Sequence, residues 1–226
     1  MQFDRFISLI GINNFNKIQS KNILVIGLGG VGSYVVESLV RSGILNITIA
    51  DYDVIDITNL NRQIMTNLNN IGNKKTDEIE KRILSINNKV KVTKIDEFID
   101  SSNINIINNN YDYVVDCSDT FNTKCEIIKN CLDKKIKFIT SMGTAKKMDP
   151  SKLEIIDIRK TSYDPLAKKI RKWVKDNRIK GKIMTISSSE VPFKMDNNIL
   201  GSTSFVPSSA GLLITSYIIN DIINNK

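Results

Sequence analysis

Hydrophobic residues in the first two thirds of the chain fall into two alternating patterns. Short continuous apolar runs are typical of strands buried on both faces of a parallel sheet, and they occupy residues 23–26, 47–49, 111–116 and 137–140. Apolar residues spaced by three or four predict helices between them, over residues 35–43, 76–86 and 120–132. Residues 90–95 alternate apolar and charged positions, which predicts a half-exposed edge strand. This order predicts an α/β fold with a mainly parallel sheet flanked by helices.

The pattern changes after Asp149-Pro150. We predict one domain over residues 1–226, in which a core of residues 1–145 is followed by a C-terminal elaboration of residues 146–226. The elaboration contains two strand-like runs, at residues 155–158 and 184–191, a basic amphipathic helix within residues 159–175 and a final apolar helix at residues 212–223. The last helix is too short and too polar for a membrane span, which favours a core or dimer helix. A short helical piece is predicted at residues 9–18.

A glycine-rich turn follows the first apolar run. Gly27, Gly29, Gly30 and Gly32 separate that run from a helical pattern, and Asp51 ends the second run about 20 residues later. Such glycines allow a tight turn, a close approach to phosphate and packing of the helix on the strand, while the acidic residue binds a ribose hydroxyl. We therefore predict a Rossmann-like nucleotide site. A turn that serves packing alone leaves Asp51 unexplained.

Further polar residues follow the predicted strands at the same edge of the sheet. Asp53 comes two residues after Asp51, and the third apolar run, residues 111–116, leads into Asp116-Cys-Ser-Asp119. Mg²⁺ takes one or two carboxylates together with substrate phosphates, so these aspartates suit a metal-bound nucleotide. The alternative for Asp119 is that it only caps the following helix.

The stretch from Thr58 to Gln63 has amides, one arginine and no apolar period. Its donors suit phosphates, although a plain loop has the same composition. Lys74 or Lys75 begins the next helix, where the helix dipole disfavours a positive charge. That position makes either lysine a candidate phosphate ligand.

The chain has no histidine, which excludes histidine-based acid–base catalysis, Ser/His or Cys/His nucleophiles and histidine metal ligands. Its cysteines, Cys117, Cys125 and Cys131, form no CxxC pair. An odd count argues against a disulfide framework, and the N-terminus does not have the pattern of a signal peptide. These features predict a reducing, cytoplasmic location.

The net charge is +8, and positive residues concentrate in residues 159–182. A concentrated basic segment suits a phosphate backbone such as that of RNA. Two alternatives remain open: a solvated helix face, and a genome-wide bias toward Lys that the abundant Asn and Ile also suggest.

The collected motifs resemble those of the ThiF/MoeB-like adenylyltransferases in the ubiquitin-activating-enzyme-like superfamily. They comprise the glycine turn, Asp51-x-Asp53, Asn59-x-Asn61-Arg62-Gln63, a lysine after Gly72, and Asp116-Cys-x-Asp119. Gln2-Phe-x-Arg5, Asp149-Pro150, Lys160-Thr161 and Asp164-Pro-Leu-Ala-x-Lys-Ile170 resemble the branch that dehydrates threonylcarbamoyladenosine in tRNA. The resemblance covers nearly the whole chain.

The resemblance implies ATP and Mg²⁺ as cofactors, a carboxyl-adenylate intermediate and a homodimer in which Arg5 reaches the other subunit's phosphates. It favours Lys75 over Lys74, because the family lysine lies three residues after Gly72. The implied catalytic residues are Arg5, Arg62, Lys75 and Asp119, with Asp119 as the metal ligand. The implied nucleotide-binding residues are Gly27, Gly29, Gly30, Gly32, Asp51, Asp53, Asn59, Arg62, Gln63, Lys75 and Asp116.

By this resemblance the chain converts threonylcarbamoyladenosine in tRNA to its cyclic hydantoin form. The main alternative is an adenylyltransferase that activates the C-terminus of a ubiquitin-like sulfur-carrier protein. That branch has zinc-binding CxxC pairs and a later reactive cysteine; here neither is found, so we expect no structural zinc and doubt a sulfur-transfer partner. An NAD-dependent dehydrogenase and a non-catalytic nucleotide-binding module fit the motifs less well.

Overall fold

A single seven-stranded sheet runs through the protein, in the order β3-β2-β1-β4-β5-β7-β6. We describe a computed structural model covering residues 2–194 and 200–224. In chain order the strands are β1 (Asn22–Ile26), β2 (Asn46–Ala50), β3 (Lys91–Ile95), β4 (Tyr113–Asp116), β5 (Lys137–Ser141), β6 (Leu153–Asp157) and β7 (Met184–Ser188). Every neighbouring pair is parallel except β6 with β7. The predicted α/β class with a mainly parallel sheet is confirmed.

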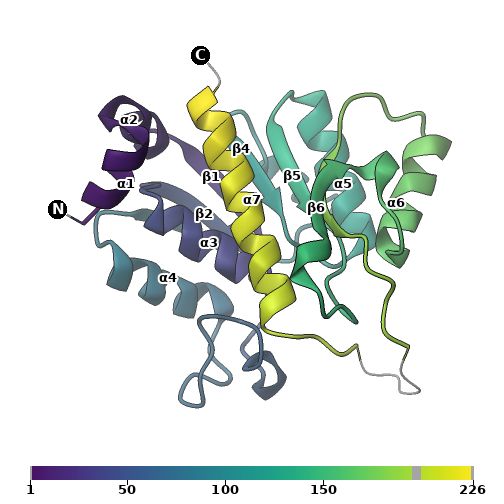
Figure 1. Cartoon of the computed structure of the whole chain (residues 1–226), viewed down its shortest axis with the longest axis horizontal. Helices are drawn as coiled ribbons and strands as arrows, with labels where there is room; N and C mark the ends of the chain where they lie inside the picture. The colour runs from purple at the N-terminus through teal and green to yellow at the C-terminus, as the bar shows by residue number, and fades with distance from the viewer. Residues whose placement is uncertain (1, 195–199, 225–226) are drawn as a thin grey trace.

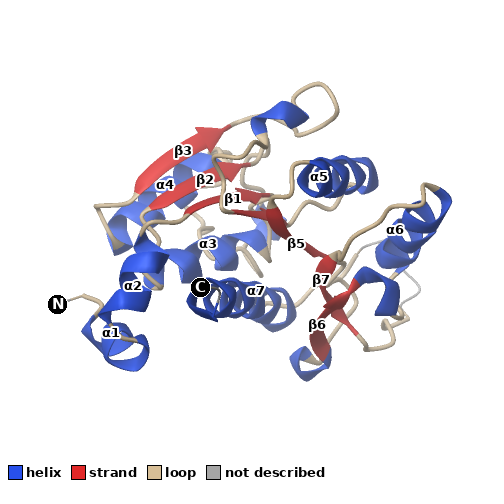
Figure 2. Ribbon diagram, turned by 90° about the horizontal axis from the view of Figure 1, so that it is seen from above, coloured by secondary structure: helices blue, strands red, loops and turns tan. Residues whose placement is uncertain are grey.

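Helices cover both faces of the sheet (Figure 2). They are α1 (Asp4–Ile10), α2 (Ile12–Gln19), α3 (Gly32–Arg41), α4 (Lys75–Ile86), α5 (Phe121–Asp133), α6 (Pro165–Asp176) and α7 (Phe205–Asn224). Residues of α2, α3, α4 and α7 share one hydrophobic core with the sheet, and residues of α5 and α6 share the other. Short 3₁₀ turns occur at Ile57–Asn59, Ile104–Ile106, Pro150–Lys152 and Ile158–Lys160.

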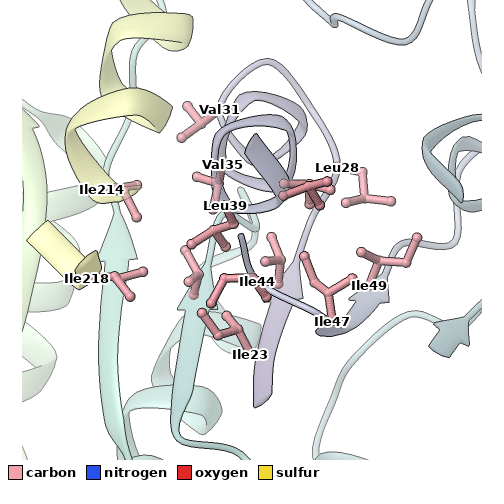
Figure 3. Close-up of a cluster of buried hydrophobic side chains, with 14 of the residues drawn as sticks. Ile23, Leu28, Val31, Val35, Leu39, Ile44, Ile47, Ile49, Ile214 and Ile218 are labelled. Carbon is pink, nitrogen blue, oxygen red and sulfur yellow. The ribbon is translucent and has the colours of Figure 1, made fainter. Parts of the chain in front are cut away.

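The larger core lies between β1 and the helices α3 and α7. Val35 and Leu39 of α3 face Ile214 and Ile218 of α7 over strand residues such as Ile23, as Figure 3 shows. All five of these side chains are fully buried. Burial on both faces explains why the strand runs read as continuous hydrophobic sequence.

The C-terminal part extends the same sheet and the same core. β7 pairs with β5, β6 adds an antiparallel edge, and α7 crosses over α3 (Figure 1). A Cβ at Gly211 would lie 2.6 Å from the Val31 carbonyl oxygen, so this glycine permits the close contact. By length and composition α7 could cross a membrane, but half of its apolar window is buried against the protein. It therefore packs as a core helix.

Two boundaries differ from the sequence-based prediction. The N-terminal segment forms two short helices, α1 and α2, instead of one piece over 9–18, because Gly11 between them adopts a φ of +80°. The final helix α7 begins at Phe205 and not at residue 212, because Thr203 Oγ1 accepts a hydrogen bond from the Val206 N–H and Pro207 fits the first turn of a helix. By contrast, β3 is the half-exposed edge strand that its alternating sequence predicts.

Candidate active site

The glycine turn joins β1 to α3 with very little space around its backbone. Gly27 has a φ of +86°, and its N–H donates to the Ala50 carbonyl at the end of β2. A Cβ at Gly32 would lie 1.8 Å from the Gly27 carbonyl oxygen, which ties the start of α3 to the turn. At Gly29 no heavy atom of the described residues lies within 4 Å of a Cβ position. The turn therefore leaves open space at Gly29, where the backbone is accessible to a ligand.

Asp51 follows β2 beside this turn. Its Oδ2 accepts from the Leu28 N–H at 2.6 Å, and its Oδ1 accepts from the Asp53 N–H at 2.9 Å. Burial raises the pKa of Asp51 above the usual aspartate range, while the charge of Lys75 and the two backbone hydrogen bonds oppose that rise. The carboxylate is thus held in a fixed orientation at the mouth of the glycine turn.

Lys75 lies at the first position of α4 and points toward the same aspartates. Its Nζ is 2.6 Å from Asp53 Oδ2, and its side chain is only 7% exposed. Lys74 points elsewhere: its Nζ contacts Asp96 at 2.8 Å. The structure thus brings Lys75, and not Lys74, together with Asp51 and Asp53.

The polar stretch from Thr58 to Gln63 forms an ordered turn that packs beside the glycine turn. Asp56 caps its 3₁₀ turn, and the Asn59 side chain accepts from the Asp56 N–H. Arg62 packs its stem against Gly30, with Cγ 3.2 Å from the Cβ position there, and its guanidinium donates to the Thr58 carbonyl.

Gln63 in the same segment is buried, and its Oε1 has no hydrogen-bond partner among the described residues. A buried acceptor without a partner is costly, so a donor is expected there once the site is filled. An ordered turn with a buried amide differs from the plain loop that was the alternative for this sequence.

Asp116 and Asp119 have different environments. Asp119 is exposed after β4 and is available to a metal ion. Asp116, predicted among the nucleotide ligands, is fully buried. Its Oδ2 accepts from Lys124 Nζ at 3.0 Å and from Thr140 Oγ1 at 2.5 Å, and its Oδ1 accepts from Ser118. A carboxylate enclosed in this way cannot contact the nucleotide, so Asp116 supports the turn that carries Cys117 and Asp119.

Lys124 was not predicted, although the sequence carries a signal for it. The residue lies on the apolar stripe of α5 with Phe121, Cys125 and Ile128, and its side chain is fully buried. A lysine on an apolar helix stripe indicates a buried anionic partner.

Lys147 is a second buried lysine that the sequence analysis missed. Its Nζ donates to the Glu190 carbonyl, and burial lowers the pKa of Lys147 while Asp164 and Glu190 oppose that shift. It joins the loop after β5 to the loop after β7. No periodic pattern marks it in the sequence.

Two aromatic rings that the sequence analysis did not single out lie beside the site. Tyr52, 59% exposed, meets Phe98 edge-on with ring centroids 5.1 Å apart. The charge of Asp53 raises the pKa of Tyr52, and partial burial, Asp119 and Asp51 act in the same direction. Because 46 residues separate the rings, local sequence patterns do not predict this contact.

Arg5 is not brought to the site of its own chain. Gln2, one helical turn earlier, donates through its side chain to the Ile86 carbonyl at the far end of α4. Eleven residue steps of α4 separate Ile86 from Lys75, or about 16 Å. Arg5 is exposed and belongs to α1, and Figure 1 shows that helix away from the loop that follows β2.

Metal binding at the site would depend on few protein ligands. Among residues 2–194 and 200–224, no group of three or more Cys, Asp or Glu side chains is arranged to hold a metal. One exposed carboxylate, Asp119, fits Mg²⁺, which is usually held by one or two carboxylates and by the phosphates of its nucleotide.

A mainly parallel sheet, a glycine turn with an adjacent aspartate and a buried lysine are together typical of a Rossmann-like nucleotide-binding protein. A model of the ThiF family matches residues 3–190, and the chain belongs to that family. The resemblance seen in the motifs is thus confirmed.

Relatives of known name cover almost the whole chain. The tRNA threonylcarbamoyladenosine dehydratase of Bacillus subtilis is 34% identical over 242 residues, covering 99% of this chain and 95% of the relative. The Escherichia coli tRNA N6-threonylcarbamoyladenosine dehydratase, solved in complex with AMP, matches with a TM-score of 0.93 and 31% identity, covering 98% of this chain and 94% of that one. The same enzyme solved with ATP gives the same TM-score and identity.

Proposed function

We propose that this chain dehydrates threonylcarbamoyladenosine in tRNA at the expense of ATP and forms the cyclic hydantoin through a carboxyl-adenylate. The observation that carries the proposal is the cluster of Asp51, Asp53 and Lys75 beside the open Gly29 backbone. Support comes from the similarity along the full length to dehydratases of that name, one of them solved with ATP.

Each part of ATP has a counterpart in the site. Asp51, fixed by two backbone N–H groups, accepts from a ribose hydroxyl. The rings of Tyr52 and Phe98 next to it provide an apolar surface for adenine. The glycine turn, Asn59, Arg62, Gln63 and Lys75 face the phosphates, and the unpartnered Gln63 Oε1 would gain a donor from the bound ligand or its water.

The chemistry follows from the poor reactivity of a carboxylate toward nucleophiles. The threonyl carboxylate attacks the α-phosphate, and pyrophosphate leaves with the electrons of the broken P–O bond. The carbamoyl nitrogen then attacks the activated carbonyl, loses its proton, and AMP departs with one carboxylate oxygen, so the net change is loss of water. Arg62 and Lys75 stabilise charge on the leaving phosphates, and the closing step is intramolecular and hence fast.

Asp119 is proposed as the protein ligand of Mg²⁺. When bound, the ion would neutralise phosphate charge at this edge of the sheet. Lys124 keeps the buried charge of Asp116 balanced, so the turn carrying Asp119 stays in place.

The proposal includes a homodimer in which Arg5 completes the partner's site, since Arg5 lies far from Lys75 in its own chain. Phe205, Leu212 and Leu213 expose an apolar strip on α7 that a second copy could cover. Mixing Arg5→Ala and Asp51→Ala chains tests this. Reassortment into mixed dimers restores one site in four, or about a quarter of wild-type activity, whereas an arginine acting within its own chain gives none.

The decisive test of the function is AMP release from ATP and Mg²⁺ with three substrates in parallel. These are tRNA bearing threonylcarbamoyladenosine, unmodified tRNA, and a carrier protein ending in Gly-Gly. AMP with the first alone supports the dehydratase. AMP with the carrier alone supports the sulfur-carrier alternative, for which the chain offers no cysteine after Cys131. A cytoplasmic location and the absence of a sulfur-transfer partner stay predictions.

A further inference from the structure

A concave surface lies at the edge of the sheet opposite the nucleotide site. It has a volume of about 590 Å³ and is lined by Lys21, which directly precedes β1, and by the first residues of β4 and β5. Five lysines line this amino-edge cleft: Lys17, Lys21, Lys134, Lys135 and Lys137. Asp112 is its acidic lining residue. The nucleotide site, at the carboxyl ends of the same strands, does not use these residues.

The lysines come from separate parts of the chain. Lys17 lies in α2, and Lys21 follows two residues after that helix. Lys134 and Lys135 directly follow α5, and Lys137 begins β5. Three have partners that hold them in position: Lys21 contacts Asp112 at 2.8 Å, Lys137 contacts Asp221 at 2.6 Å, and Lys134 Nζ donates to the Ile107 carbonyl.

Lys17 and Lys135 form no ion pair within residues 2–194 and 200–224. Counting Asp112 and Asp221 against the five lysines leaves the cleft with an excess of about three positive charges at neutral pH. The lysine charges around the cleft repel one another in the unliganded protein. An anionic ligand bound in the cleft would reduce this repulsion.

The positive surface continues beyond the cleft. A Cβ at Gly181 would lie 2.8 Å from Leu132, two residues before Lys134, so the segment after α6 lies against the end of α5. This segment adds Arg178, Lys180 and Lys182, which are all exposed. Lys182 and Lys137 each precede the paired residues Thr185 and Thr140 by three positions, which places both at the same edge. The second half of the basic segment 159–182 therefore belongs to the amino edge and not to the nucleotide edge.

We infer that the amino-edge cleft binds the phosphate backbone of the RNA substrate, at a distance from the reacting nucleoside. The inference rests on the proposed tRNA substrate. A small anion needs one or two cations, whereas a row of lysines around a cleft and along the adjoining edge suits a chain of phosphates. The five-residue strands separate the amino edge, which holds the cleft, from the carboxyl edge, which holds the nucleotide site, by about 17 Å. A polynucleotide bound at both edges would cover that distance with on the order of five nucleotides, at roughly 3.4 Å each.

Lysine is suited to this role because backbone contacts position an RNA without reading its sequence. The cleft would therefore contribute affinity for tRNA in general, while recognition of the modified nucleoside stays with the carboxyl edge. Binding at the cleft should be strongly dependent on salt and independent of the modification.

The test uses the double variant Lys17→Gln/Lys135→Gln, which removes two positive charges without leaving a carboxylate unpaired. The control Lys89→Gln/Lys152→Gln removes the same charge from exposed positions on the turn after α4 and on the 3₁₀ turn before β6, where neither lysine has an ion pair among the described residues. Binding of unmodified tRNA, without ATP, is measured from 50 to 200 mM salt.

In the cleft variant, affinity at low salt should fall about tenfold and the slope of log affinity against log salt should drop by about one to two. In turnover, KM for tRNA should rise by a similar factor while kcat and ATP affinity stay unchanged. The control should behave as the wild type, and thermal melting should show both variants folded.

Equal affinity and an equal salt slope in the cleft and control variants would overturn the inference. The inference would also be overturned if the cleft variant bound pyrophosphate more weakly than the wild type but bound tRNA equally well. The cleft would then be a site for a small anion. Binding of unmodified tRNA is measured without catalysis. If the wild-type enzyme failed to dehydrate modified tRNA, the proposed function would be wrong, but the binding measurement would still test the cleft.

Discussion

Gly32 stands so close to Gly27 that a Cβ on it would lie 1.8 Å from the Gly27 carbonyl oxygen. Gly29, two residues after Gly27, has no described atom within 4 Å of its Cβ position. The three glycines of one motif therefore answer different needs. Gly27 provides a positive φ and Gly32 a backbone contact, while Gly29 leaves space in which a phosphate can approach.

This difference predicts opposite outcomes for two alanine variants. Gly32→Ala forces the backbone apart and should lower the free energy of unfolding by at least about 3 kcal/mol. Gly29→Ala should change it by less than about 1 kcal/mol yet weaken ATP binding at least tenfold. Urea unfolding and ATP titration measure the two effects. Normal ATP affinity in a folded Gly29→Ala protein would show that the turn serves packing alone.

Asp116 and Lys124 form a fully buried ion pair, 3.0 Å between Oδ2 and Nζ. Lys124→Met leaves the carboxylate unpaired in the core and should cost about 3–5 kcal/mol of unfolding free energy. The double variant Asp116→Asn/Lys124→Met removes both charges and should recover most of that loss. Chemical denaturation of the wild type, Lys124→Met, Asp116→Asn and the double variant gives the coupling energy. Equal destabilisation in the single and double variants would mean that shape, and not charge, makes the pair necessary.

Local patterns were sufficient to predict most of the strands and helices and the glycine turn between β1 and α3, because each depends on residues close in the sequence. They were insufficient wherever the sheet brings distant segments together. The burial of Asp116 depends on Lys124 from α5 and Thr140 from β5, and the Tyr52–Phe98 contact depends on β2 lying beside β3. The amino-edge cleft likewise requires that α2, β4 and the end of α5 meet at one edge.

The three cysteines should be unreactive in the native protein. Burial raises the pKa of each of Cys117, Cys125 and Cys131 to about 12, which leaves almost no thiolate at neutral pH. Treatment with N-ethylmaleimide at pH 7 should leave ATP-dependent activity unchanged, and mass spectrometry should find all three thiols unmodified until denaturant is added. Rapid modification of one native thiol with loss of AMP formation would point to a thioester mechanism and to the sulfur-carrier alternative.

Asp51 should give the protein an acid-sensitive nucleotide site. Because burial raises its folded pKa above the unfolded value, the folded state holds a proton more tightly there. Stability from this group is present below the unfolded pKa and decreases as pH rises through the folded pKa. ATP binding has the opposite dependence, since protonation removes charge from the ribose acceptor as pH falls through the same range.

The measurement is ATP affinity and urea unfolding of wild type and Asp51→Asn from pH 7 down to pH 4. As the pH is lowered, wild-type ATP affinity should begin to fall at a pH above the usual pKa of an aspartate. Over the same range the free energy of unfolding of the wild type should increase relative to that of Asp51→Asn. Lys75→Met removes the charge that opposes the rise in the pKa of Asp51, so its affinity should fall at a still higher pH. If ATP affinity fell at the same pH in Lys75→Met as in the wild type, another group would be responsible for the pH dependence, and the charge of Lys75 would not affect Asp51.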